Sequence, residues 1–137
     1  MNVKRWFIAF IVVFIIFFAL DWFFNSVCLM KQYEATAHLW RPKDEMMGFM
    51  PVWIVIDIIW SLLFCYIYTK GYEGKGKGIA EGLRYGLWLG LFVTIPMALG
   101  VYTYMPIPGR LALGWFITGM FTYLLCGLVL GLIYKKA

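Results

Sequence analysis

The sequence predicts an all-α membrane protein with four transmembrane helices in an antiparallel bundle, and two observations lead to this prediction. Four apolar stretches, at residues 6–25, 50–68, 79–102 and 111–134, fill most of the 137 residues. Each is about 20 residues long, enough for a helix to cross the ~30 Å hydrocarbon core of a bilayer. The composition is 64% hydrophobic and 14% charged, whereas soluble domains carry about 25% charged residues. We therefore expect a single membrane domain over residues 1–137 and no separate soluble domain.

Basic residues are distributed unevenly between the two sides of the predicted membrane. Eight fall on the side of the termini: Lys4, Arg5, Lys70, Lys75, Lys77, Arg84, Lys135 and Lys136. Four fall on the other side: Lys31, Arg41, Lys43 and Arg110. This excess is the positive-inside pattern, which predicts that both termini are cytoplasmic. Topology and contact with anionic lipid headgroups account for the net charge of +5, so no nucleic-acid partner is expected.

Lys4 and Arg5 precede the first stretch, residues 6–25, and together they imitate the basic start and apolar run of a signal peptide. The run is too long and too rich in Phe and Ile, and no small-residue cleavage site follows it. These features predict a retained transmembrane helix. Asp21 and Asn25 lie at i,i+4 spacing near its end and therefore share one face of the helix.

The connection over residues 26–49 is expected to contain a short helix in the membrane interface. Tyr33, Ala37 and Trp40 recur at helical spacing, with Trp40 as the anchor, and Pro42 should end the helix. The outer segment also carries soft groups that suit copper(I), namely Cys28, Met30, His38, Met46, Met47 and Met50. Their spacing matches no metal motif, and methionine is also an ordinary packing residue. We assign no metal and no cofactor.

The second stretch, residues 50–68, places Pro51 in the first turn of its helix, where the missing N–H costs nothing. Asp57 and Ser61 follow at i,i+4 spacing. The Gly- and Lys-rich segment 69–78 comes next. No strand precedes this segment and the GxxxxGK[ST] pattern is absent, so we interpret it as a solvated basic turn and not as a phosphate-binding loop.

The third and fourth stretches, residues 79–102 and 111–134, carry small residues four apart. These are Gly82, Gly86, Gly90, Gly127 and Gly131. Such spacing lets two helix backbones approach closely. We expect the two glycine ridges to face each other within one subunit; the alternative is that one ridge makes a contact between subunits. Pro96 is expected to kink the third helix. Glu81 and Arg84 are expected to pair or to extend toward the interface.

Aromatic residues form 20% of the chain and gather near the ends of the predicted spans. The set comprises Trp6, Trp22, Trp40, Trp53, Tyr68, Tyr102, Tyr104, Trp115 and Tyr134. This placement predicts aromatic belts at the two interfaces. A quinone or pigment pocket would use the same residues, but the belts already account for their positions.

Asp21 and Asp57 are the sharpest functional signal, because ionisable groups within spans are costly and often functional. Adjacent antiparallel helices would bring the two carboxyl groups together. Two nearby carboxylates disfavour double ionisation, so one is expected to hold a proton at neutral pH. With Asn25 and Ser61 they form an intramembrane polar cluster that suits proton-coupled transport or a cation site. The structural alternative is that Asp21 lies at the wet interface and Asp57 bonds Ser61, Asn25, a tryptophan N–H or Arg41.

Three segments carry a resemblance to a known family: W-R-P-x-x-E-M at residues 40–46, T-K-G-Y-E-G-K-G at 69–76, and G-L-R-Y-G at 82–86. On these segments the chain resembles a family of small, uncharacterised four-helix proteins of the bacterial inner membrane. The resemblance covers nearly the whole length. It implies a location and an architecture and no activity, so no catalytic residue is carried over.

The sequence thus favours a non-enzymatic four-helix protein that acts as an accessory or scaffolding subunit. It would belong to a homo-oligomer or to a larger membrane complex, with membrane lipids around it. The alternative function is a small proton- or cation-coupled transporter that uses Asp21 and Asp57.

Overall fold

The computed structural model describes residues 1–75 and 78–135, and every regular element in these ranges is a helix. Four helical segments are long and apolar enough to cross a membrane: Val3–Cys28, Met50–Gly71, Gly78–Tyr104 and Gly109–Ile133. The prediction of an all-helical protein with four helices long and apolar enough to cross a membrane is therefore confirmed. Gly76 of the basic turn, and Lys77 and Lys136 of the charge count, lie outside the described residues.

The spanning helices are longer than the apolar stretches that predicted them. The first consists of α1 (Val3–Phe23) and the π-helical segment η1 (Phe24–Cys28), and the second is α4 (Met50–Gly71). The third runs through α5 (Gly78–Thr94), the π-helical segment η3 (Ile95–Gly100) and α6 (Val101–Tyr104), and the fourth is α7 (Gly109–Ile133). Polar residues extend each helix because its hydrogen bonds do not require apolar side chains; the Asn2 side chain, for example, accepts the N–H of Arg5 and caps α1.

The connection between the first two spans holds three short helices: α2 (Met30–Ala35), the 3₁₀ turn η2 (Ala37–Leu39) and α3 (Lys43–Gly48). The chain leaves η2 in an extended conformation at Trp40, two residues before Pro42. Pro42 precedes α3, which the sequence analysis did not predict. Asp44 and Glu45 in its first turn favour a helix start there, since carboxylates stabilise a helix N-terminus.

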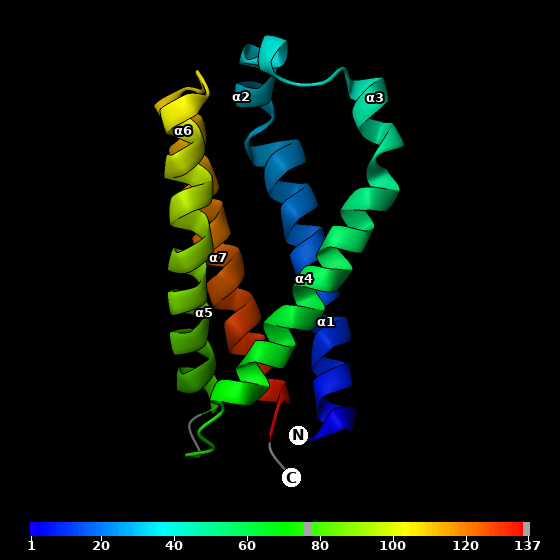
Figure 1. Cartoon of the computed structure of the whole chain (residues 1–137), viewed down its shortest axis with the longest axis vertical. Coiled ribbons are helices and arrows are strands. Elements are labelled where there is room, and N and C mark those ends of the chain that lie inside the picture. The colour runs from blue at the N-terminus through cyan, green and yellow to red at the C-terminus, as the bar shows by residue number, and fades with distance from the viewer. Residues whose placement is uncertain (76–77, 136–137) are drawn as a thin grey trace.

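Both termini lie at one end of the molecule, together with the connection between α4 and α5 (Figure 1). We call this the terminal end. The opposite, connecting end carries α2, α3 and α6 (Figure 1). At the terminal end α4 lies beside α5, whereas at the connecting end the two helices are widely separated (Figure 1). Helix α1 packs against both α4 and α7.

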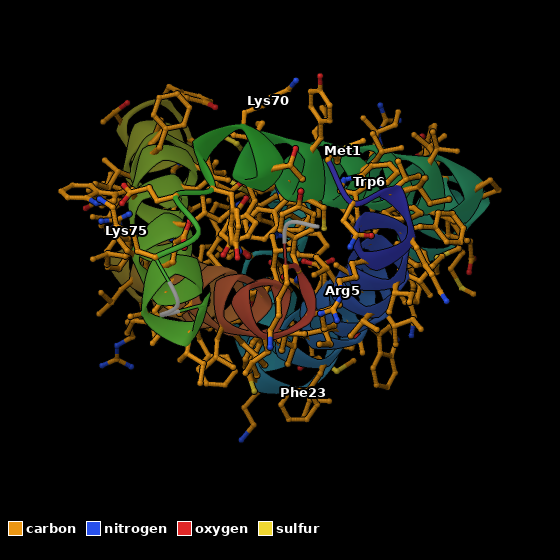
Figure 2. All side chains as sticks on the ribbon, turned by 90° about the horizontal axis from the view of Figure 1, so that it is seen from below. Met1, Arg5, Trp6, Phe23, Lys70 and Lys75 are labelled. Carbon is orange, nitrogen blue, oxygen red and sulfur yellow. The ribbon has the colours of Figure 1, made fainter. Side chains whose placement is uncertain are left out.

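The core occupies the space between the four spans. It contains Ala9 and Val13 from α1, Phe64, Cys65 and Tyr68 from α4, and Tyr123, Cys126 and Leu130 from α7, with Tyr134 after it. Seen from the terminal end, side chains fill the space that the ribbons enclose, while Lys70 and Phe23 point away from the bundle (Figure 2). The Arg5 side chain reaches from α1 to the last turn of α7, where it donates to the carbonyl of Ile133 at 3.4 Å.

Helices α5 and α7 form the closest pair in the molecule, and their backbones touch. A methyl group built on Gly82 would overlap the carbonyl oxygen of Gly127, and one on Gly86 would overlap the carbonyl oxygen of Tyr123. The partner numbers fall along α7 as they rise along α5, so these two helices run in opposite directions. The buried glycines of this contact are Gly82, Gly86, Gly90, Gly127 and Gly131.

A charged cluster lies at the terminal end, in the connection between α4 and α5. Arg84 pairs with Glu73 at 2.9 Å, and Lys75 pairs with the same carboxylate at 3.0 Å. Glu81 accepts the backbone N–H of Glu73 at 2.6 Å. Arg84 therefore pairs with Glu73, and Glu81 with the turn backbone, in place of the Glu81–Arg84 pair considered from the sequence.

One segment stands apart from the bundle. Every residue from Arg41 to Ile56 is exposed, and this range includes α3 and about the first two turns of α4. We call residues 41–56 the α3–α4 arm; Figure 1 shows it at the edge of the molecule, leading away from α5 and α7. Asp57 is the first buried residue after the arm.

Candidate functional site

Asp21 and Asn25 meet where α1 widens into the π-helical turn η1. The Asn25 amide donates to the backbone carbonyl of Asp21 at 2.9 Å and to its carboxylate at 3.0 Å. A π turn replaces the usual i→i−4 hydrogen bonds with i→i−5 bonds, such as the bond from the Leu29 N–H to the Phe24 carbonyl. The asparagine side chain thus stabilises both the irregular backbone and the orientation of the carboxylate.

A chain of hydrogen bonds continues from Asn25 to two other elements. The Tyr33 hydroxyl on α2 donates to Asn25 Oδ1 at 2.6 Å, and the Trp115 indole on α7 donates to the Tyr33 hydroxyl at 2.7 Å. Each group in this chain donates to the next one, and the last donor, Asn25, donates to the Asp21 carboxylate. Burial raises the pKa of the Tyr33 phenol, and the charge of Asp21 adds to this effect. Tyr33 therefore keeps the proton that it donates.

The same end carries an aromatic cluster around this chain. Trp40 packs edge-on against Tyr33 with ring centroids 5.5 Å apart, and against Trp115 at 6.1 Å. Its indole N–H donates to the Thr36 hydroxyl at 2.9 Å. Trp40 therefore lies in a packed contact that fixes the position of Tyr33 over Asn25.

Asp57 and Ser61 lie on the buried stripe of α4, one helical turn apart. Asp57 is 4% exposed and Ser61 is fully buried. Phe17 on α1 and Trp60 on α4 stack on each other with ring centroids 3.8 Å apart. Asp21 and Asp57 each lie about one turn from one of these rings toward the connecting end, so they occupy the same level of two packed helices. Within residues 1–75 and 78–135, neither the Asp57 carboxylate nor the Ser61 hydroxyl has a hydrogen-bond partner. Arg41 pairs with Glu45 instead.

Aromatic side chains close this site toward the terminal end. Trp60 stacks on Phe17 with ring centroids 3.8 Å apart and on Phe64 at 4.8 Å, and its indole donates to the Tyr123 hydroxyl at 2.9 Å. Phe64 lies one turn beyond Ser61 on the same stripe of α4. A ligand of the carboxylates would therefore enter from the side of the connecting end and the arm.

Two residues that support this site were not identified from the sequence. Trp115 was interpreted as part of an aromatic belt and Tyr33 as part of an interfacial helix, yet their polar atoms join three helices in one hydrogen-bonded chain. A buried tyrosine or tryptophan usually finds a partner for its O–H or N–H. That rule marks both residues as candidates, but pairing them requires the fold.

Asp21 and Asn25 are thus hydrogen-bonded, and Asp57 and Ser61 lie nearby without partners among the described residues. Four residues carry the candidate site: Asp21, Asn25, Asp57 and Ser61. Within the described ranges, no group of three or more His, Cys, Asp and Glu side chains is placed to hold a metal ion. Two carboxylates in an apolar setting can take up a proton or a small cation, because either one relieves their repulsion.

Comparison of the chain with family models, with curated proteins and with solved structures gave no match.

Proposed function

We propose that this chain is a small non-enzymatic subunit of a membrane assembly, formed in the first place by copies of itself. The observation that carries the proposal is the α3–α4 arm, which is exposed over its whole circumference from Arg41 to Ile56. Val52, Trp53 and Val55 are each about half exposed, at 51%, 53% and 52%. The arm thus presents large apolar side chains with little support from its own bundle.

The position of the arm favours a partner that is also a membrane helix. Helices associate in lipid through close packing, since lipid already solvates apolar side chains. At the connecting end the arm leads away from the α5–α7 pair (Figure 1), so a helix of a second copy can pack along its exposed sides. In a two-fold dimer the arm of each copy packs against the arm of the other. The same surface of both copies is then buried, and neither arm is left exposed for a third copy.

A bacterial inner membrane with both termini in the cytoplasm is part of this proposal. Its support is the positive charge at the terminal end, where Lys4, Arg5, Lys70 and Lys75 belong to the described residues. Cys28 is exposed and is the last residue of the first spanning segment, at the end that lies away from the two termini. A membrane-impermeant maleimide should therefore label Cys28 in intact spheroplasts; labelling only after the membrane is opened would reverse the orientation.

Self-association is tested by mass and by cross-linking. We expect the protein, extracted in native-lipid particles, to have the mass of two or more copies. In a Cys28→Ser background, Val55→Cys on the arm should form a disulfide-linked dimer under mild oxidation. Phe92→Cys on α5 is the matched control, because Phe92 is 77% exposed but lies outside the arm. The proposal is contradicted if the native-lipid particles hold a single copy and if Val55→Cys and Phe92→Cys cross-link to the same extent. If the particles hold a different protein as well, the assembly is a hetero-complex.

Proton- or cation-coupled transport is a second candidate, favoured by the position of Asp21 and Asp57 at the same level of the packed helices α1 and α4. Asp21→Asn and Asp57→Asn should each abolish flux of the coupled ion in proteoliposomes. Flux that is unchanged in both variants removes this candidate and leaves the assembly proposal intact.

A further inference from the structure

Asp57, which is buried, and Asp21, which is half-buried, have no positive partner in the part of the chain that the structure describes. The ion pairs there are Arg41–Glu45, Lys75–Glu73 and Arg84–Glu73, and none involves Asp21 or Asp57. A charge in the hydrocarbon region costs several kcal/mol unless it is paired or neutralised. Asn25 supplies hydrogen bonds to Asp21 alone, so the pair retains an uncompensated negative charge.

Ser61 provides an independent sign of a missing ligand. Its side chain is fully buried, and among the described residues its hydroxyl oxygen has no hydrogen-bond partner. A buried hydroxyl without a partner costs about 1–3 kcal/mol. A side chain on a helix leans toward the preceding turn, and the preceding turn on this face of α4 carries Asp57. Ser61 and Asp57 therefore lie one turn apart on the same buried stripe of α4, and a ligand between them would satisfy the free oxygen.

We propose that Asp21, Asp57 and Ser61 bind one monovalent cation, a sodium ion or a proton, at the base of the α3–α4 arm. Carboxylate and hydroxyl oxygens are hard ligands that suit either cation, and one positive charge relieves the repulsion between the carboxylates. Asn25 holds Asp21 in place and is itself held by Tyr33.

The site and the hydrogen-bonded chain beside it draw on five elements. Asp21 belongs to α1, Asn25 to η1, and Asp57 and Ser61 to α4; Tyr33 on α2 bonds Asn25, and Trp115 on α7 bonds Tyr33. The Tyr33 phenol keeps its proton for Asn25, so proton uptake falls to the two carboxyl groups. Self-association is not required for this site, and the binding of a cation can be measured whether or not transport follows.

The test measures unfolding of the full chain in lipid nanodiscs at constant ionic strength. At pH 8, replacing choline chloride with sodium chloride should raise the midpoint temperature if the ligand is sodium. If the ligand is a proton, sodium and choline should give the same midpoint, and lowering the pH in choline chloride should raise it. Asp57→Asn should remove whichever response the wild type shows. Asp44→Asn on the exposed arm is the matched control and should respond as the wild type does.

Ser61→Ala is a second test variant, which can be measured even if Asp57→Asn does not fold. Loss of one hydroxyl ligand, worth about 1–1.5 kcal/mol, should raise the sodium concentration at half effect by about tenfold. For a bound proton the same variant should move the pH at half effect in the acidic direction. A wild type that responds neither to sodium nor to pH overturns the proposal, as does an equal response in wild type, Asp57→Asn and Ser61→Ala. Binding without ion flux in liposomes keeps the site and removes only the transport candidate.

Discussion

Replacing Gly82 with alanine should separate α5 from α7. The added methyl group would overlap the carbonyl oxygen of Gly127, and would stand 3.0 Å from the carbonyl carbon of Gly127 and from the Cα of Gly131. Ordinary van der Waals contacts lie at 3.4–4 Å. All three neighbours are backbone atoms of a helix, so none can move alone, and the helices must shift apart or rotate.

The size of the effect follows from two opposing contributions. Alanine in place of glycine favours a helix by about 1 kcal/mol. Against this, forcing extra atoms into a packed contact costs about 1–3 kcal/mol and occasionally more, and separating the backbones weakens Cα–H···O contacts worth about 0.5–1 kcal/mol each. We expect Gly82→Ala to lower the free energy of unfolding by about 1–3 kcal/mol, since several neighbours are affected at once.

The assay is reversible unfolding in mixed micelles with increasing dodecyl sulfate, followed by circular dichroism and tryptophan fluorescence. Gly100→Ala is the matched control, because a methyl group there meets nothing within 4 Å and the residue lies in the same spanning segment. It should leave stability unchanged or raise it slightly. The packing argument is wrong if Gly82→Ala and Gly100→Ala unfold at the same detergent composition.

Two further predictions concern the ends of the bundle. Tyr33→Phe removes a hydroxyl that bonds both Asn25 and Trp115, and should cost about 1–3 kcal/mol in the same unfolding assay, whereas Tyr102→Phe, at a half-exposed position, should cost nothing measurable. Hydrogen bonds from Lys75 and Arg84 lower the pKa of the Glu73 carboxyl, so their stabilisation is complete above the ordinary glutamate pKa and is lost as the pH falls through the lower folded value. Arg84→Gln should raise the Glu73 pKa toward its ordinary value in a carbon-13 NMR titration; an unchanged titration would mean that the pair does not form in solution.

The spans were predictable from the sequence because hydrophobic length is a local property. Residues 50–68 alone identify the second helix, and the structure extends it only to Gly71. The glycines at positions 82, 86 and 90 were likewise recognisable, because a spacing of four places them on one face of a helix. The structure places that face against α7.

The partners of polar groups were not predictable, because they depend on how distant segments meet. Tyr33 and Trp115 lie 82 positions apart and bond only because η1 and α2 bring the connection back over α7. The partner of Arg41 was not predictable either. Arg41 was one of the partners considered for Asp57, but the arm carries it away from the bundle, and it pairs with Glu45, its i,i+4 neighbour.

Asp57 lies at the level where α4 passes from an exposed arm to a buried helix. An α-helix is stiff over this length, so a neighbouring molecule that displaced the arm would also tilt α4 and change the distance between the carboxyl groups of Asp57 and Asp21. Assembly through the arm and cation binding at Asp57 would then be linked equilibria, and linkage between binding equilibria is reciprocal. Any factor by which assembly strengthens cation binding must therefore equal the factor by which the cation strengthens assembly.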